Sequence, residues 1–150
     1  MTKNNWRVSE SEIKFIKKAI GNKLTGKYLI KFESDLAKKF KTNYAIAVNS
    51  GTSALHTALY ALGIRAGDEV IVPPLTFSAT AFAVIYLGAK PVFADVDIET
   101  FNICPKSIEK KINNKTKAII TVSIFGLIPN MIEILNLKKK YKLMLLEDNA

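Results

Sequence analysis

Residues 50–53, with the sequence Ser-Gly-Thr-Ser, combine small and hydroxylated side chains of the kind that bind anions. They follow an apolar run at 44–48 and precede an Ala- and Leu-rich stretch of helical periodicity. The first backbone N–H groups of a helix have no partner within the helix, and the helix dipole adds positive potential at that end. Gly51 allows a phosphate to approach the backbone closely, and the neighbouring hydroxyls add donors. The segment predicts a phosphate site, although an ordinary Ser-capped helix explains it equally well when it is taken alone.

Two more side chains could meet a ligand at the same place. Phe77 follows the apolar run at 69–72, and Asp148 ends the apolar run at 143–147. An aromatic ring can stack on a flat heterocycle, and a carboxylate can pair with a protonated ring nitrogen and keep the ring an electron sink. A phosphate cradle, an aromatic ring and a carboxylate together suit a phosphorylated pyridine cofactor. The alternatives are that Phe77 is an ordinary core residue and that Asp148 caps a turn or helix.

Apolar periodicity predicts the elements that would carry these residues. The predicted strands are residues 44–48, 69–72, 91–95, 118–122 and 143–147, and the predicted helices are residues 9–20, 30–40, 52–62, 78–87, 105–112 and 131–141. The strands are apolar on both faces, as in a parallel sheet that helices cover on each side. Right-handed crossovers then give an α/β fold, a three-layer sandwich with a mostly parallel sheet. Ligands collect at the carboxyl ends of such strands, which is where Gly51, Phe77 and Asp148 fall.

Composition excludes several classes of function. A chain of 150 residues, 49% of them hydrophobic, suits one sizeable core. The net charge of +9 comes from lysines scattered over predicted helix faces without interleaved aromatic rings, so we expect no nucleic-acid partner. Cys104 and His56 are the only residues of their types, which excludes an internal disulfide and a clustered Cys/His metal site. No stretch has the length of a membrane span or the pattern of a signal peptide, so we expect a cytoplasmic protein without a membrane partner.

An ordered set of motifs carries a family resemblance. The segments concerned are residues 24–26, 32–33, 49–55, 61–73, 76–80, 88–97 and 147–148. Among them, Asn-Ser-Gly-Thr-Ser-Ala-Leu at 49–55 and Glu-Asp at 147–148 have the order and spacing found in the sugar aminotransferases of the DegT/DnrJ/EryC1/StrS family. The chain resembles that family over nearly its whole length. The resemblance implies a fold-type-I enzyme with pyridoxal 5′-phosphate as its cofactor, working as a homodimer in polysaccharide biosynthesis.

The resemblance also implies a role for each site residue. Gly51, Thr52 and Ser53 would bind the cofactor phosphate, Phe77 would stack on the ring, and Asp148 would pair with the pyridine nitrogen. The lysine that forms the Schiff base would lie beyond residue 150, so no catalytic residue is assigned within the chain, and no metal is expected.

Three positions depart from the family pattern. Ser123 stands where the family commonly has a histidine, and Leu127 and Asn130 replace the usual glutamine and aspartate. These differences concern the substrate side of the pocket more than the cofactor side.

The expected organisation is an N-terminal helical segment at 1–40 and a partial cofactor-binding large domain at 41–150. The chain would be a truncated aminotransferase, inactive alone, whose intact parent transfers an amino group from glutamate to a keto group of a nucleotide-linked sugar. The alternatives are a pyridoxal-phosphate sugar dehydratase of the same fold and a non-catalytic remnant that binds phosphate or dimerises. In the family's sheet two further strands lie between strand 44–48 and strand 143–147, so strand 44–48 would here lack its neighbours.

Overall fold

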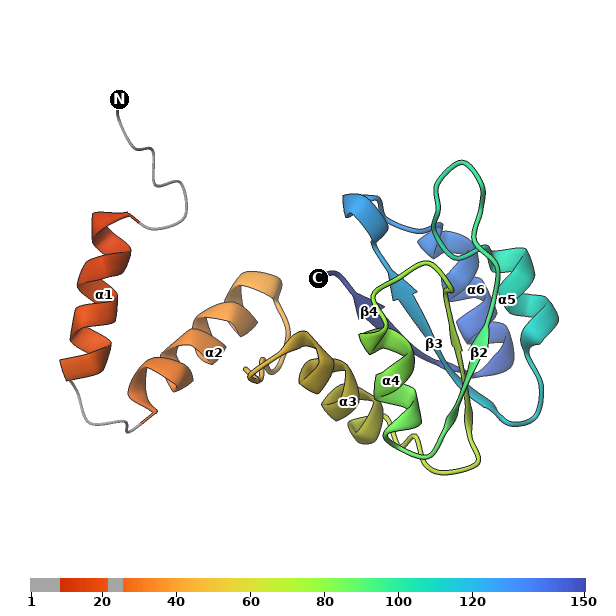
Figure 1. Cartoon of the computed structure of the whole chain (residues 1–150), viewed down its shortest axis with the longest axis horizontal. Helices are drawn as coiled ribbons and strands as arrows, with labels where there is room; N and C mark the ends of the chain where they lie inside the picture. The colour runs from red at the N-terminus through yellow and green to blue at the C-terminus, as the bar shows by residue number, and fades with distance from the viewer. Residues whose placement is uncertain (1–8, 22–25) are drawn as a thin grey trace. The chain divides into compact units, whose positions relative to one another are not determined.

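The computed structural model describes residues 9–21 and 26–150, so the expectations for residues 1–8 and most of the motif at 24–26 lie outside the described residues. The elements are α1 (Glu10–Gly21), α2 (Lys27–Phe40), α3 (Gly51–Ala61), β1 (Glu69–Val72), α4 (Ala79–Ile85), β2 (Lys90–Phe93), α5 (Pro105–Lys111), β3 (Thr116–Val122), the 3₁₀ turn η1 (Ile124–Gly126), α6 (Met131–Tyr141) and β4 (Met144–Asp148) (Figure 1). The chain divides into one unit that ends at Ala47 and a second unit from Val48 to Ala150. None of the described helices is long and apolar enough to cross a membrane.

The first unit contains the amphipathic helices α1 and α2, neither of which buries a residue. At the start of α1 the carboxylate of Glu12 accepts a hydrogen bond from the backbone N–H of Ser9, which supplies one of the helix's missing partners. This bond holds the pKa of Glu12 below its usual value. On α2, Lys31 and Asp35 form an exposed ion pair of 2.6 Å one turn apart.

Residues 44–48, predicted to form a strand, do not form one. The side chains of Tyr44 and Ile46 are 83% and 73% exposed, and the segment has no place in the described sheet. Its local bonds run elsewhere, since the N–H of Ala47 donates to Glu33 Oε1 at 2.8 Å. An apolar pattern favours a strand only where another strand can pair with its backbone groups, and no described strand does so here. The prediction of a strand at 44–48 is therefore wrong for this structure.

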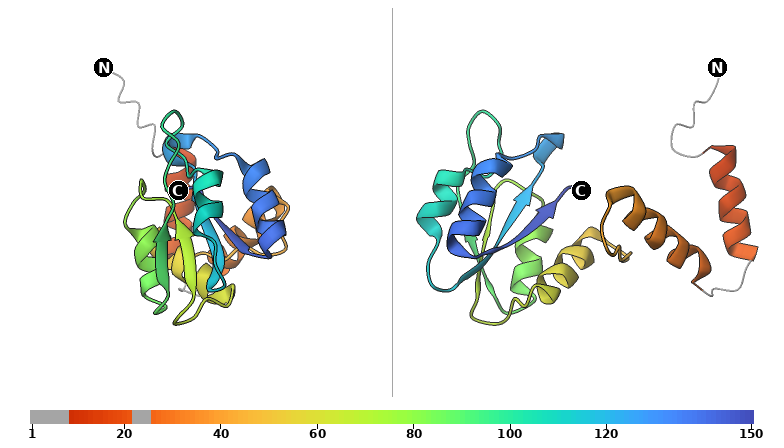
Figure 2. Two further views of the ribbon diagram at one scale, coloured as in Figure 1. Left: turned by 90° about the vertical axis from the view of Figure 1, so that its right-hand side faces the viewer. Right: turned by 180° about the vertical axis from the view of Figure 1, so that it is seen from behind.

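The second unit is built on a four-stranded parallel sheet in the order β2-β1-β3-β4. Helices α3 and α4 lie on one face and α5 and α6 on the other, which gives three layers (Figures 1 and 2). The predicted α/β sandwich with a parallel sheet is confirmed, and four of the predicted strands are present with small changes at their ends.

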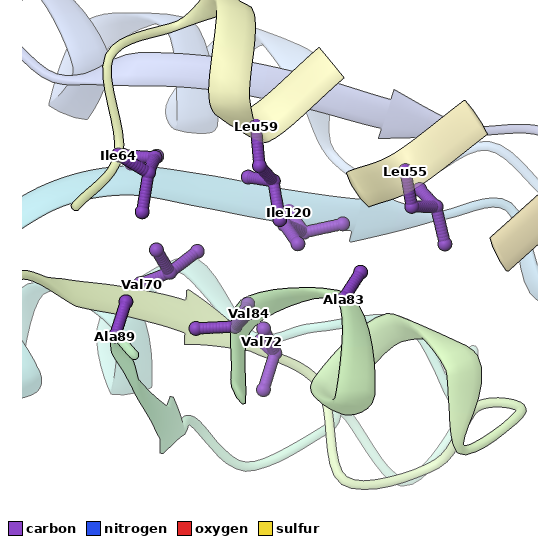
Figure 3. Packing of buried hydrophobic residues seen from close by; sticks show 10 residues of the cluster. Leu55, Leu59, Ile64, Val70, Val72, Ala83, Val84, Ala89 and Ile120 are labelled. Carbon is purple, nitrogen blue, oxygen red and sulfur yellow. The ribbon is translucent and has the colours of Figure 1, made fainter. Parts of the chain in front are cut away.

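Alternation along the strands divides the core into two clusters. On the face of α3 and α4, Leu59, Val72 and Ile120 belong to the cluster shown in Figure 3, where Leu59 lies over Ile120. On the face of α5 and α6, Ile71 and Ile119 belong to the second cluster. Successive side chains of a strand point to opposite faces, so residues one apart on β3 serve different layers. The same alternation determines on which face of the sheet the last side chain of each strand lies.

Candidate functional site

All four described strands run in the same direction, so the segments that follow β1, β3 and β4 leave the sheet at one edge. Helix α3 leads back towards the start of β1, which brings its first turn to that same edge. Helix α3 contacts both α4 and β4. The predicted site residues are thereby brought to one edge of one unit.

The first turn of α3 is organised by Ser50. Its backbone is extended, and its Oγ accepts a hydrogen bond from the N–H of Ser53 at 3.1 Å and donates to Ser53 Oγ at 3.0 Å. The N–H groups of Gly51 and Thr52 have no partner among the described residues. A Cβ placed on Gly51 would meet no atom within 4 Å, so space is open beside the backbone. The cap thus leaves two amides, with the positive end of an 11-residue helix, available to an anion.

Phe77 lies in the connection between β1 and α4 and is 79% exposed. Its carbonyl accepts the N–H of Thr80 at 3.1 Å, which begins the turn into α4. The hydroxyls of Thr76 and Thr80 are 3.0 Å apart and tie the same turn together. The ring is therefore presented to the surroundings and is not a core side chain, which removes one of the alternatives for this residue.

Asp148 is the last residue of β4 and is half-buried. Leu146, two residues earlier, packs against the cluster under α3 and α4, so alternation directs the Asp148 side chain to the face that carries the start of α3. One carboxylate oxygen, Oδ1, accepts the N–H of Ala150 at 3.2 Å. The other oxygen, Oδ2, has no donor among the described residues. The carboxylate is thus part of a local turn and keeps one acceptor for a ligand.

The sequence did not indicate how Asp148 is held. The N–H of Ser123, at the end of β3, donates to the Asp148 carbonyl at 3.0 Å, and Ser123 Oγ donates to Asn149 Oδ1 at 2.6 Å. Ser123 was notable only as a departure from a family pattern, and Asn149 only as a residue at a strand end. The register between β3 and β4 brings the two together, and register is set by the fold and not by a local motif.

A further carboxylate that follows a strand has a different role. Asp97, in the loop after β2, accepts the N–H groups of Glu99 and Thr100 through Oδ1, both at 3.0 Å. These bonds, that from Thr100 first, hold the pKa of Asp97 below its usual value. Asp97 closes a turn, and its Oδ1 is engaged there.

Known proteins resemble this chain in sequence and in fold. The model of the DegT/DnrJ/EryC1/StrS aminotransferase family matches residues 8–150. The chain is 48% identical to GDP-perosamine synthase from Escherichia coli O157:H7 over 125 residues, which make up 83% of this chain and 34% of that protein. The chain thus spans about a third of the length of the curated relatives it matches.

Solved structures extend the comparison to the fold. An aminotransferase from Psychrobacter cryohalolentis superposes with a TM-score of 0.88 at 40% identity, over 93% of this chain and 36% of that one. The E. coli GDP-4-keto-6-deoxy-D-mannose-3-dehydratase, with hydrated pyridoxal phosphate bound, superposes with a TM-score of 0.88 at 33% identity, over 96% of this chain and 39% of that one. The expected cofactor is confirmed as one that structural relatives of this chain bind.

Proposed function

This chain belongs to the DegT/DnrJ/EryC1/StrS aminotransferase family, and from that premise we propose that its second unit holds pyridoxal 5′-phosphate for a sugar aminotransferase. The observation that carries the proposal is that three groups lie at the same end of one parallel sheet. The open amides of α3 and the Asp148 carboxylate lie on the face of the sheet that α3 and α4 cover. Phe77 is exposed in the connection that leads into α4, the helix beside α3. A phosphate, a flat ring and a ring nitrogen are the three features that such groups bind.

The cofactor's phosphate is assigned to the first turn of α3. The N–H groups of Gly51 and Thr52 would donate to it, and the hydroxyls of Thr52 and Ser53 add further donors. Because Ser50 already engages the N–H of Ser53, we assign Ser53 a contact through its side chain. The space beside Gly51 allows the phosphate to reach the backbone.

The ring of the cofactor is assigned to Phe77 and Asp148. The exposed Phe77 ring can stack on one face of a pyridine. Asp148 Oδ2 can accept the proton of the ring nitrogen, and the negative charge beside that nitrogen favours its protonated form. Pyridoxal phosphate supplies an electron sink for reactions at an amine-bearing carbon, and its strength depends on this proton.

The proposed reaction of the whole protein is transfer of an amino group from glutamate to a keto group of a nucleotide-linked sugar. The identity to GDP-perosamine synthase and the likeness to a solved aminotransferase support this class of reaction. We propose a cytoplasmic homodimer as the working form. No lysine of this chain is assigned to the Schiff base, so the chain by itself is expected to bind the cofactor without turning over.

A sugar dehydratase of the same fold is the second candidate, because the dehydratase from E. coli superposes as well as the aminotransferase does. The two candidates share the cofactor site and differ in what they form. Product analysis with the whole protein distinguishes them. Formation of an amino sugar only when glutamate is present would indicate the aminotransferase, and formation of a deoxy sugar would indicate the dehydratase. A non-catalytic remnant would bind the cofactor or a partner subunit and form neither.

The site is tested by titrating this chain with pyridoxamine 5′-phosphate, the amine form of the cofactor, and following its absorbance. We expect Phe77→Ala to weaken binding about two- to tenfold, from the loss of a stacking contact. We expect Asp148→Asn to weaken it about tenfold or more, from the loss of a charge-assisted hydrogen bond.

Two matched variants control for general effects. Phe40→Ala removes an exposed ring from α2 in the first unit, and Asp95→Asn removes a carboxylate beyond the end of β2. Both should bind as the parent does. Equal affinity in the parent, Phe77→Ala and Asp148→Asn would reject the assigned site.

A further inference from the structure

The ends of β3 and β4 are joined by a side-chain hydrogen bond that cofactor binding as proposed above does not use. Ser123 Oγ donates to Asn149 Oδ1 at 2.6 Å. The N–H of the same serine donates to the Asp148 carbonyl at 3.0 Å. One residue after β3 therefore holds two consecutive residues at the end of β4, the first by its backbone and the second by its side chain.

The register between β3 and β4 explains how Ser123 reaches the residue next to Asp148. Val122 lies opposite Asp148, so Ser123 falls opposite Asn149. Alternation directs the Asp148 carboxylate to the face of α3, while Leu145 and the residues that alternate with it belong to the face of α5 and α6. The Ser123–Asn149 bond uses neither carboxylate oxygen of Asp148, so Oδ2 stays without a donor among the described residues.

The bond also determines where the next amide lies. Ala150 follows Asn149 directly, and its N–H donates to Asp148 Oδ1 at 3.2 Å. Fixing Asn149 therefore fixes the donor that orients the carboxylate. The β3–β4 ladder ends at Asp148, so Ser123 supplies the described contacts that hold the chain at this point. A group that must meet a ring nitrogen needs its position held to about 0.5 Å, which an unrestrained strand end does not provide.

We propose that Ser123 is a positioning residue: through Asn149 it holds the turn that directs Asp148 Oδ2 towards the ring nitrogen of the bound cofactor. The inference rests on the proposed function, because it concerns the same site. It assigns Ser123 and Asn149 no contact with the cofactor itself. Its consequence is that both residues affect the cofactor only as long as Asp148 carries its carboxylate.

The test is a set of pyridoxamine 5′-phosphate titrations with Ser123→Ala, Asn149→Ala and the double variant. Each single variant should bind about three- to tenfold more weakly than the parent, and the double variant should be no weaker, because all three lack the same hydrogen bond. The pKa of the bound ring nitrogen, read from the pH dependence of the cofactor's absorbance, should fall in all three. Ser123→Thr keeps a hydroxyl and should restore both values.

A second background tests the route through Asp148. In Asp148→Asn, the further change Ser123→Ala should leave the affinity unchanged, because the group being positioned has lost its charge. Asn113→Ala is the control for a merely structural effect, since it breaks a side-chain bond of 2.7 Å to Glu69 at the opposite edge of the sheet. It should lower stability and leave the affinity and the ring pKa as in the parent.

The outcomes separate the two proposals. A parent chain that binds no pyridoxamine 5′-phosphate overturns the proposed function and this inference with it. A parent chain that binds, with Ser123→Ala unchanged or with its effect persisting in the Asp148→Asn background, overturns the positioning role alone. Circular dichroism of every variant identifies any that fail to fold. If Ser123→Ala fails to fold, Asn149→Ala tests the same hydrogen bond, because Asn149 is exposed and its substitution should leave the fold intact.

Discussion

At the scale of single residues, Ser50 caps α3 and also determines which amides remain for the proposed anion site. Ser50 satisfies the N–H of Ser53 and leaves the two preceding amides open. A cap that engaged Thr52 instead would leave a different pair of donors. The hydroxyl-rich sequence predicted the start of the helix, but taken alone it fitted an ordinary Ser cap as well as an anion site. It could not predict which amide the cap would take.

Removing this cap should destabilise the second unit. We expect Ser50→Ala to lower the free energy of unfolding by about 1 kcal/mol, because the Ser53 N–H loses its acceptor. Urea denaturation followed by circular dichroism measures the change. Ser50→Asn restores an acceptor at the cap and should stay close to the parent. An alanine variant as stable as the parent would show that the cap is not needed for the fold.

At the scale of elements, the sequence predicted what local chemistry decides and missed what pairing decides. The strands that became β1 to β4 were found because each is short, apolar and followed by a turn or helix signal. Residues 44–48 have the same local pattern, but strand formation needs a neighbour that the described chain lacks. The turn η1 was not predicted either. Phe125 in this turn has a left-handed backbone, φ 52°, which is uncommon for a residue other than glycine.

Glu69 links the segments at the opposite end of the sheet, where the strands begin. It is 8% exposed at the start of β1, and its carboxylate accepts from Asn113 at 2.7 Å and from Lys90 at 3.4 Å. The Asn113 bond, followed by the lysine, holds the pKa of Glu69 below its usual value. The starts of β1 and β2 and the loop before β3 are thereby tied to one group.

This carboxylate makes stability depend on pH in a stated direction. Because the pKa of Glu69 is lower in the folded chain, its contribution is complete above the ordinary value of 4.5 and is lost as the pH falls through the folded value. Acidification from neutral pH should lower the free energy of unfolding of both proteins. We expect the drop to be about 1 kcal/mol smaller in Glu69→Gln than in the parent. Urea denaturation at a series of pH values measures this. Glu99→Gln, on an exposed loop, should follow the parent, and identical pH profiles for all three proteins would contradict the role of Glu69.

At the scale of the whole molecule, two cores share one sheet. Ile119 and Ile120 are neighbours on β3, each fully buried, and they belong to different clusters. The strand that carries both is hydrogen-bonded on each side, to β1 and to β4. Neither layer of helices can lose its packing without exposing this strand, so the two clusters should unfold together.

Conservative changes on β3 test this cooperativity. Ile119→Val and Ile120→Val should each lower the stability by about 1 kcal/mol, and the double variant by the sum within about 0.5 kcal/mol, because the side chains serve opposite faces. Each variant should show one transition in urea. Ile132→Val, an exposed position on α6, should have little effect. Two separate transitions in any of the β3 variants would show that the layers are independent.

The place of β3 in the sheet also has a consequence for synthesis of the chain. A polypeptide leaves the ribosome from its N-terminus, and β3 lies between a partner made before it and a partner made after it. When β3 emerges it can join β1 and β2, but one side of its backbone stays without hydrogen-bond partners until α6 and β4 have followed. During that interval β3, whose Ile119 and Ile120 are fully buried in the folded unit, is paired on one side only, so we expect it to be a binding site for a chaperone.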